Sequence, residues 1–336
     1  MNTTATTNFP LKLTTSIQQL LCCPICYSRL ALTPSQLECK NSQCRACFPI
    51  INETPILINE TSSVFSISDF LNHNHTHLKP KSYLERLLIN LIPGINLNIT
   101  TKANYQKFIE LLLEQNQNPR VLVIGGSVVD KGMEPLLSVP EIELIETDVA
   151  FGSRISVICD AHNLPFAGGS FDGVVVQAVL EHVVDPNRCV EEIYRVLKPH
   201  GLVYSETPFM QQVHLGKYDF TRFTHLGHRR LFRKFAEIDS GAVCGPGMAL
   251  AWSYQYFLLS FVSRPLTRAF VKAFARITLF WLKYFDYYLI NQPGTFDSAS
   301  GYYFLGMKSE QILSDKELLT LYKGTQSSRV SSSNLV

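Results

Sequence analysis

Charged residues are scarce in this chain, and neither sign is in excess. They make up 17% of the 336 residues, and 30 Lys and Arg against 28 Asp and Glu leave a formal net charge of +2. A protein that neutralises many phosphates is strongly basic, so this balance argues against a nucleic-acid partner. Hydrophobic residues, at 46%, supply enough apolar material for a sizeable core, which excludes a disordered or fibrous chain. The length suggests two domains, or one domain with large additions.

The sequence also lacks a charged-then-apolar run that ends in a cleavage site over residues 1–21. We therefore expect no signal peptide and a cytoplasmic protein, in which cysteines persist as thiols or bind metal. Six of the nine cysteines fall between Cys22 and Cys47. Such a cluster favours a metal site over a disulfide framework.

Within this cluster, Cys23 and Cys26 enclose two residues, the spacing by which two thiolates meet one tetrahedral zinc ion. The second pair is either Cys39 with Cys44 or Cys44 with Cys47, and spacing alone favours the latter because it repeats the two-residue gap. A module this short cannot bury enough apolar surface to fold alone, so four thiolates on zinc would stabilise it. Four protein ligands leave no open position, so the metal would be structural.

Residues 20–58 resemble the short zinc ribbon that often accompanies methyltransferases. They carry its CPxC knuckle, a hairpin, a second cysteine pair, the step Phe-Pro-Ile at 48–50 and a closing apolar strand at 54–58. In that family the last ligand lies a few residues before the aromatic residue. The resemblance therefore implies a ribbon domain over 18–60, with Cys22 and Cys47 as spare thiols and with four zinc ligands: Cys23, Cys26, Cys39 and Cys44.

Residues 61–80 are rich in Ser, Asn and His and are predicted to be a linker. Three histidines alternate there, at positions 73, 75 and 77, and a solvated loop is favoured over a metal site. Helical spacing of apolar residues follows over 81–117, with a break at Pro93 and Gly94.

Short apolar runs then alternate with helical stretches. The runs lie at 121–124, 142–145, 155–158, 174–176 and 202–204, and a helical period covers 186–197. Runs without polar alternation are typical of strands that helices cover on both faces. The pattern predicts an α/β domain over 81–310 with a doubly wound, mostly parallel sheet, whose ligand lies at the carboxyl ends of the strands.

Polar or small residues follow three of these strands. The turn Gly125, Gly126, Ser127 lets a ligand approach the backbone, and Asp148, 23 positions after Gly125, is placed to accept hydrogen bonds from ribose hydroxyls. Asp160 suits the exocyclic amine of adenine. The Lys-Ser/Thr pair of a P-loop is absent, so the pattern predicts a nucleoside pocket without a strong phosphate cradle.

The block 159–201 resembles the core of class I S-adenosylmethionine-dependent methyltransferases, of the Rossmann-like type 11 kind. It carries, in order, the family's segments Asp-Ala at 160–161, Leu-Pro-Phe at 164–166, Ser-Phe-Asp at 170–172, Leu-Glu-His-Val at 180–183 and Arg-Val-Leu-Lys-Pro at 195–199. The resemblance implies S-adenosylmethionine as cofactor, with the ribose on Asp148 and adenine on Asp160 and the Ala161 backbone. It also implies that Gly125, Gly126 and Ser127 flank the methionine part and that Gln177 and Leu180 line the same cleft.

The chain departs from the family at its glycine loop. Val123 stands where the family has an acid, and Ser127 and Val129 stand where it has glycines. About a dozen residues separate Asp148 from Asp160, so the usual helix between them is shortened or missing. The alternative to a methyltransferase is therefore a non-catalytic binding module of the same fold, which holds a protein or membrane partner.

Candidates for the acceptor side of the cleft lie at 206–224. We predict that His214 is the general base, because imidazole titrates near neutral pH. Asp219 would orient it or bind the acceptor, and Arg222 would pair with Asp219 or hold an anionic acceptor. A purely structural ion pair between Asp219 and Arg222 is the alternative. His225 and His228 precede a basic helix and are expected on a solvated face.

The segment 245–292 is apolar and aromatic and is predicted to be a helical insertion. It contains both tryptophans and is interrupted by five basic residues, Arg264, Arg268, Lys272, Arg276 and Lys283. Three interpretations are open: a lid or homodimer face, a pair of membrane-surface helices over 248–290 that admits a lipid-linked acceptor, or a transmembrane span. The sequence leaves the acceptor open among small molecules, saccharides and lipid-linked compounds. Residues 326–336 are expected to be a disordered tail.

Overall fold

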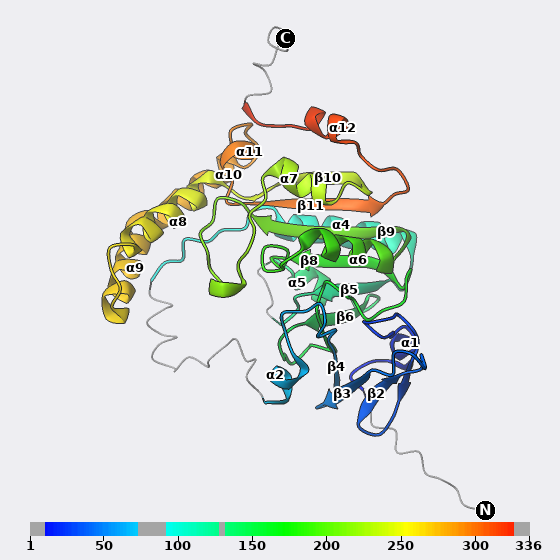
Figure 1. The fold of residues 1–336 in the computed structure, drawn as a ribbon. Helices are drawn as coiled ribbons and strands as arrows, with labels where there is room; N and C mark the ends of the chain where they lie inside the picture. The colour runs from blue at the N-terminus through cyan, green and yellow to red at the C-terminus, as the bar shows by residue number, and fades with distance from the viewer. Residues whose placement is uncertain (1–10, 73–91, 128–131, 326–336) are drawn as a thin grey trace, which may run out of the picture.

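A computed structural model describes residues 11–72, 92–127 and 132–325 (Figure 1). Within those residues the strands form one sheet in the order β1-β2-β3-β4-β7-β6-β5-β8-β9-β11-β10. The strands are β1 (Leu30–Leu32), β2 (Gln36–Cys39), β3 (Cys47–Ile51), β4 (Thr54–Leu57), β5 (Arg120–Ile124), β6 (Glu143–Asp148), β7 (Val157–Cys159), β8 (Phe171–Gln177), β9 (Leu197–Pro208), β10 (Phe235–Cys244) and β11 (Gly301–Lys308).

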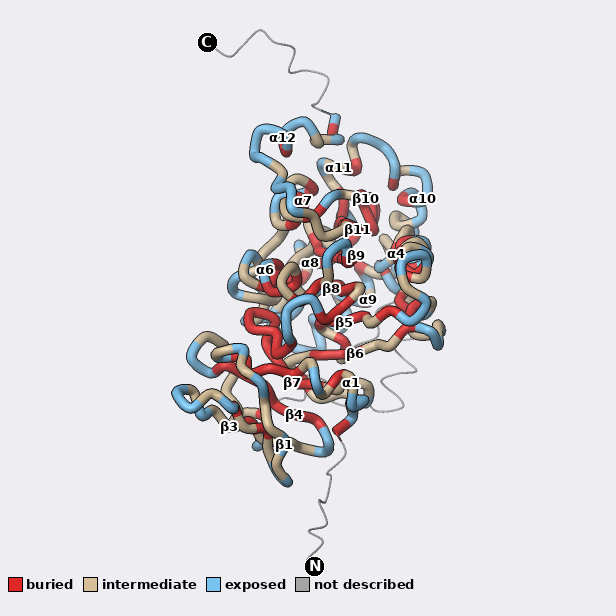
Figure 2. The backbone as a smooth tube through the Cα atoms, turned by 90° about the vertical axis from the view of Figure 1, so that its right-hand side faces the viewer, coloured by how far each residue is buried: buried red, intermediate tan, exposed pale blue. Residues whose placement is uncertain are grey.

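The central part of the sheet is parallel, as predicted. Neighbouring strands from β4 through β7, β6, β5 and β8 to β9 run in the same direction, and β11 and β10 complete the sheet antiparallel. These strands are buried along most of their length (Figure 2). Their runs of Val, Ile and Leu form strands here because apolar side chains are needed on both faces.

Helices cover both faces of the parallel strands. On one face, α4 (Thr101–Gln115) packs Tyr105 and Phe108 against Val121 and Tyr204. On the other, α6 (Pro186–Val196) packs Ile193 into the larger core cluster. The remaining helices are α1 (Thr15–Gln18), α2 (Ile67–Leu71), α5 (Glu134–Leu137), α7 (His225–Leu231), α8 (Pro246–Leu259), α9 (Pro265–Leu279), α10 (Asp286–Leu289), α11 (Thr295–Ser298), α12 (Asp315–Thr320) and the 3-10 turns η1 (Gly216–Tyr218) and η2 (Phe280–Phe285). The α/β, mostly parallel architecture is thus confirmed.

The N-terminal segment is continuous with this sheet. β4 pairs with β7 in parallel, with Ile56 opposite Ile158 and Leu57 opposite Cys159. The Cys22 N–H also donates to the Pro165 carbonyl at 2.9 Å. Pairing with β4 covers what would be an exposed edge of the parallel sheet, so the cysteine-rich segment and the core fold as one structure.

Two expectations about the flanks of the core need correction. Residues 61–72, assigned to a linker because of their polar composition, pack on the core: Phe70 of α2 is fully buried against a cluster that includes Ile155. The three alternating histidines at 73, 75 and 77, most of the expected helix at 81–92 and the expected tail lie outside the described residues. No helix occurs over 149–156, in agreement with the short spacing between Asp148 and Asp160.

The second correction concerns α7. His225 and His228 were expected on a solvated face, but both are buried. His228 Nε2 lies 2.9 Å from Ser205 Oγ on β9, and His225 Nε2 lies 3.0 Å from Ser240 Oγ on β10. The helix packs its histidines inward because the antiparallel strands β11 and β10 extend the sheet beneath it.

The helical insertion is present as α8, α9 and η2, which project away from the sheet (Figure 1). α8 and α9 pack against each other as a hairpin. Among the described residues, no helix is both long enough and apolar enough to cross a bilayer.

Candidate active site

A cavity lies at the carboxyl ends of β5, β6 and β7, the edge of a parallel sheet at which ligands bind. It encloses about 630 Å³ of space, including the part that is open to solvent. Four residues with an expected cofactor role line it, together with mainly apolar side chains: Gly125, Asp148, Asp160 and Ala161, with Val64, Phe65, Ile124, Val149, Val179 and Val183. We name this space the first cavity.

Asp148 is the last residue of β6, and one of its two carboxylate oxygens accepts a hydrogen bond from the protein. The Ser127 N–H donates to its Oδ2 at 2.9 Å, and no described residue is bonded to its Oδ1. Gly125 beside it has φ +84°, and a Cβ there would lie 2.3 Å from Val179 Cγ2. A glycine is therefore required at this turn, which lines the first cavity.

Asp160 is more deeply buried and bonded by the protein itself. Its Oδ1 accepts from the His162 N–H at 3.0 Å and lies 2.5 Å from His162 Nδ1, and its Oδ2 accepts from Ser63 Oγ at 2.5 Å. The Asp185 N–H donates to His162 Nε2, so His162 carries its proton on Nδ1. Burial would raise the pKa of Asp160, but these hydrogen bonds outweigh it and lower the pKa. A purine amine would therefore share the carboxylate with Ser63 and His162.

The other expected cofactor residues lie elsewhere. Gly126 faces the Glu146 carboxylate, where a Cβ would lie 2.8 Å from Oε2. Leu180 is fully buried in the core, and Ser127 meets the first cavity only through Asp148. Gln177 lines a different space. The structure thus brings four of the eight expected residues together around one cavity, and their role in binding a cofactor stays a prediction.

A second cavity, of about 590 Å³ empty volume, opens beyond β8 and β9. Its lining is more polar and includes Gln177, Glu181, Glu206, His214 and, from the first turns of α8, Met248. Gln177 accepts a hydrogen bond from Tyr105 and donates to Glu206 at 2.8 Å. This ordered row of amide and carboxylate groups suits an acceptor with hydroxyl groups.

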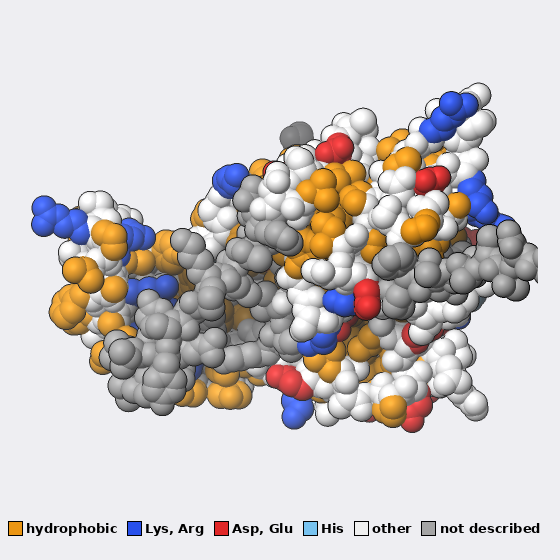
Figure 3. All heavy atoms as spheres, turned by 90° about the horizontal axis from the view of Figure 1, so that it is seen from below, with side chains coloured by type: hydrophobic (Ala, Val, Ile, Leu, Met, Phe, Trp, Pro, Cys, Tyr) orange, Lys and Arg blue, Asp and Glu red, His pale blue; other side chains and the backbone are white. Residues whose placement is uncertain are grey.

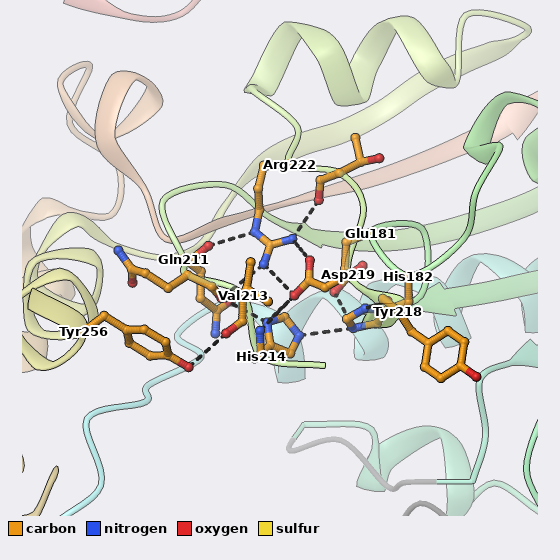
Figure 4. A network of polar contacts seen from close by, with 11 residues as sticks. Glu181, His182, Gln211, Val213, His214, Tyr218, Asp219, Arg222 and Tyr256 are labelled. Atoms are coloured by element: carbon orange, nitrogen blue, oxygen red, sulfur yellow. Dashed lines mark hydrogen bonds and ion pairs between the residues drawn. The ribbon is translucent and has the colours of Figure 1, made fainter. Parts of the chain in front are cut away.

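Two histidines, one from the lining of each cavity, point toward each other (Figure 4). His182 lines the first cavity, His214 lines the second, and their Nε2 atoms are 3.1 Å apart. His182 Nδ1 lies 2.8 Å from the Tyr218 carbonyl, and His214 Nδ1 lies 3.3 Å from the Gln212 carbonyl. Carbonyl oxygens only accept, so both Nδ1 atoms carry hydrogen and both Nε2 atoms bear lone pairs when neutral.

Two lone pairs at this distance repel each other unless they share a proton. Glu181 Oε1, 3.7 Å from His182 Nε2, favours the positive charge that such sharing creates. Burial, foremost, and the neighbouring His214 lower the pKa of His182. The lowered pKa keeps His182 neutral near pH 7, so the pair, which we call the histidine dyad, presents lone pairs that can accept a proton between the two rings.

Asp219 and Arg222 line neither cavity. They form a bidentate ion pair in which Arg222 Nη2 lies 2.9 Å from Asp219 Oδ2, and Arg222 Nε donates to the Gln211 carbonyl at 2.8 Å. The His214 N–H also donates to Asp219 Oδ2 at 2.9 Å. Burial would raise the pKa of Asp219, but Arg222 and this amide outweigh it and lower the pKa to about 2. These bonds hold the 211–222 loop and the His214 backbone, and Asp219 Oδ2 also lies 3.5 Å from His214 Nδ1. The roles expected for Asp219 and Arg222 stay predictions.

The cysteine cluster assembles on one side of β2. The Sγ atoms of four residues lie within 4.8 Å of one another, with 3.8 Å between Cys23 and Cys44 and 3.4 Å between Cys26 and Cys39. A tetrahedron with zinc–sulfur bonds of about 2.3 Å has edges of roughly 3.8 Å, so the set fits zinc. Cys47 is exposed at the start of β3 and lies outside the set, as does Cys22.

Sequence reasoning missed the part played by 63–65. Ser63 bonds Asp160, and Phe65 lines the first cavity and stacks on Tyr218 with ring centroids 5.6 Å apart. The only local signal was an aromatic residue within a polar stretch, which does not show where that residue packs.

Comparisons with known proteins agree with the ordered motif series. A family model described as a methyltransferase domain matches residues 140–205. The demethylmenaquinone methyltransferase of Desulfitobacterium hafniense (strain Y51) is 27% identical over 194 residues, which cover 57% of this chain and 68% of that protein. The ubiquinone/menaquinone biosynthesis C-methyltransferase UbiE of Rickettsia bellii (strain OSU 85-389) is 28% identical over 151 residues, 45% of this chain and 60% of that protein.

Among solved structures, a putative sarcosine dimethylglycine methyltransferase from Galdieria sulphuraria is similar. It has a TM-score of 0.41 at 15% identity, over 63% of this chain and 86% of that one.

Proposed function

The core of this chain is a class I S-adenosylmethionine-dependent methyltransferase domain, and from this premise we propose that the protein methylates a hydroxylated aromatic acceptor of the quinol type, held in the second cavity. The observation that carries the proposal is the histidine dyad, in which one ring lines a nucleoside-type cavity and the other lines a polar one. The cofactor, when bound, supplies a methyl group already activated on a sulfonium, so the protein has to provide alignment, dryness and a proton acceptor.

Three features of the first cavity fit S-adenosylmethionine. Asp148 keeps one carboxylate oxygen without a described partner, which suits a ribose hydroxyl. The apolar side chains of Ile124, Val149 and Val179 form a surface for a purine ring. Phe65 and Tyr218 stack where residues 63–65 meet the 211–222 loop, and so limit the access of water to the cavity.

The acceptor class is inferred from the second cavity together with the relatives. The two relatives described above are named as a demethylmenaquinone methyltransferase and a ubiquinone/menaquinone biosynthesis C-methyltransferase. The buried side chains of Gln177 and Glu206 offer a donor and an acceptor to the hydroxyl groups of such a ring, and Met248 offers an apolar contact. A saccharide would use the same polar groups but would gain nothing from the apolar side of this cavity.

The dyad would act as the general base. When the methyl group bonds to the acceptor, its bond to sulfur breaks and the acceptor loses one proton. His214 lines the second cavity, and its Nε2 would take that proton, which His182 Nε2 and the Glu181 carboxylate then stabilise. Asp219 and Arg222 would act as positioning residues, because they bond the His214 N–H and the Gln211 carbonyl and so fix the backbone that leads into His214.

Cys23, Cys26, Cys39 and Cys44 would hold a structural zinc ion. Since β4 continues the ribbon into the main sheet and Ser63 follows it closely, the metal would stabilise the wall of the first cavity that carries the Ser63–Asp160 bond.

The test is methyl transfer itself. We expect purified full-length protein to transfer the labelled methyl group of S-adenosylmethionine to the reduced form of a short-chain demethylnaphthoquinone, detected by mass spectrometry. If the protein binds the cofactor yet methylates neither this quinol nor a panel of sugars and phenols, the non-catalytic binding module is the better account.

A further inference from the structure

We propose that the hairpin of α8, α9 and η2 docks on the surface of an anionic lipid bilayer. The proposal concerns a surface outside both cavities and does not need the chain to be an enzyme. Its consequence for the acceptor, stated below, rests on the function proposed above.

The hairpin exposes large apolar side chains on every one of its elements. Phe261 is 74% exposed, Leu266 88% and Phe270 72%, and Phe257, Phe274 and Trp281 add to the same projection. Single exposed apolar residues are ordinary on soluble proteins, but a continuous group of this kind marks an interaction surface. At the end of the molecule that α9 forms, Figure 3 shows hydrophobic side chains beside Lys and Arg.

The charge of the hairpin points to the partner. Residues 241–285 contain no Asp or Glu, but they contain five basic residues, Arg264, Arg268, Lys272, Arg276 and Lys283. The whole chain has a formal net charge of +2, whereas this segment carries five positive charges that no acidic residue within it compensates. Basic residues set among exposed aromatic and aliphatic ones are typical of helices that lie in the interface of an anionic membrane.

The same charge argues against a second copy of the chain as the partner. A symmetric dimer through this surface would bring five positive charges against five more, with no acidic residue of the hairpin to neutralise them. Aromatic residues with polar tips also flank the apolar group: Tyr287 and Tyr288 are 62% and 75% exposed. Such residues favour the boundary between lipid and water.

The hairpin is firmly attached at its base. The buried Asp286 carboxylate accepts from the Gly247 N–H at 2.7 Å and from the Met248 N–H at 2.9 Å, at the first turn of α8. A Cβ at Gly247 would lie 2.2 Å from the Leu282 carbonyl oxygen, so α8 and η2 approach as closely as a glycine permits. The exposed group is therefore held in a fixed position relative to the core.

α8 also connects this surface to the second cavity. Met248 lines the cavity, Tyr256 donates to the Val213 carbonyl at 2.9 Å beside His214, and Phe257 and Phe261 follow at the exposed end. The helix spans only about 21 Å at 1.5 Å per residue. If the proposed function holds, an acceptor with an apolar tail reaches the cavity along α8 without leaving the lipid surface.

Flotation of the full chain with lipid vesicles tests the docking. We expect the protein to float with vesicles of phosphatidylcholine and phosphatidylglycerol in equal amounts, to bind vesicles of phosphatidylcholine alone at least tenfold more weakly, and to lose binding as salt is raised. The double variants F261S/F270S and R264Q/K272Q should each lose at least tenfold in binding to the anionic vesicles. L319S, a matched change at an exposed leucine on α12, should bind as the wild type does.

Failure to float with anionic vesicles, or equal binding by the hairpin variants, would overturn the proposal. So would a stable dimer that F261S/F270S converts to monomer, because the surface would then be a dimer face. Turnover separates this proposal from the proposed function: a water-soluble quinol should be methylated equally by the wild type and F261S/F270S. Flotation without any turnover would leave the docking intact and remove only the proposed acceptor.

Discussion

The Nε2 atoms of His182, which lines the first cavity, and His214, which lines the second, face each other at 3.1 Å. Each ring is oriented by a backbone carbonyl at its other nitrogen, from Tyr218 for His182 and from Gln212 for His214. The dyad is thus formed by two loops, one after β8 and one after β9, and neither loop could form it alone.

Replacement of His214 should slow turnover strongly without affecting cofactor binding. We expect H214Q to lower kcat by about 10²–10⁴-fold, the usual contribution of a general base, because glutamine cannot take up the acceptor's proton. Affinity for S-adenosylhomocysteine should stay at the wild-type value, since His214 does not line the first cavity. Steady-state kinetics and a binding titration on the same preparation check both points.

The matched control is H200N, at an exposed histidine of the β9 strand, which should keep wild-type kcat. Activity should also survive treatment with EDTA under conditions in which the zinc expected on the cysteine cluster is retained, as checked by elemental analysis. A loss of turnover that added Mg²⁺ or Mn²⁺ restores would instead assign Glu181, His182 and His214 to a divalent cation, and the base mechanism would be wrong.

The cysteine cluster predicts how much zinc the wild type and each cysteine-to-serine variant contain. Purified protein should contain one zinc ion per chain, and C39S should contain markedly less and unfold at a lower temperature, because three thiolates hold zinc more weakly than four. C47S should keep its zinc, since Cys47 is exposed and outside the cluster. Elemental analysis decides between the two possible second pairs: zinc lost from C47S and kept by C39S would contradict the observed set.

The protein should begin to lose stability below about pH 6.5, a higher pH than that at which carboxylates titrate. Burial foremost lowers the pKa of His225 to about 4 and that of His228 to about 3, against about 6.5 in an unfolded chain. Between those values the unfolded chain binds more protons, so the stability that these neutral histidines provide is complete above pH 6.5 and is lost as the pH falls. At pH 5 the loss should be about 2 kcal/mol for each histidine.

Urea unfolding at pH 7 and pH 5 measures this loss. H228Q keeps a polar group near Ser205 but cannot be protonated, so its stability should fall by about half as much between the two pH values. An equal fall for the wild type and H228Q would mean that His228 is not a buried neutral group.

The sequence predicted those parts of the fold that depend on local pattern. Val121 to Ile124 and the neighbouring apolar runs form the parallel strands because the burial of both faces leaves no polar position in them. The segments from Asp160 to Pro199 follow one another in a fixed order, and the carboxyl ends of the parallel strands bring Asp148 and Asp160 to the same cavity. In a parallel α/β sheet the topology determines at which edge the ligand cavity lies. The ordered motifs were therefore sufficient to predict that Asp148 and Asp160 lie at the same cavity.

Features that depend on distant segments were not predictable. Ser63 reaches Asp160 across 97 positions in sequence, and the polar composition around Ser63 indicated a linker. His225 and His228 looked solvated because they sit among basic residues, but the antiparallel pair of β10 and β11 buries them. The second cysteine pair was ambiguous by spacing, because hairpin geometry rather than the length of a gap brings Cys39 to Cys26.

The most direct test of the account is a calorimetric titration with S-adenosylhomocysteine of the wild type, D148N and D239N. The wild type should bind one equivalent. D148N should bind about 10- to 100-fold more weakly, because it loses a charge-assisted hydrogen bond worth about 1.5–3 kcal/mol. D239N, which alters an ion pair with Lys107 outside the first cavity, should bind as the wild type does. A wild type that shows no saturable binding, or a D148N that binds as tightly as the wild type, would contradict the claim that the first cavity holds the cofactor.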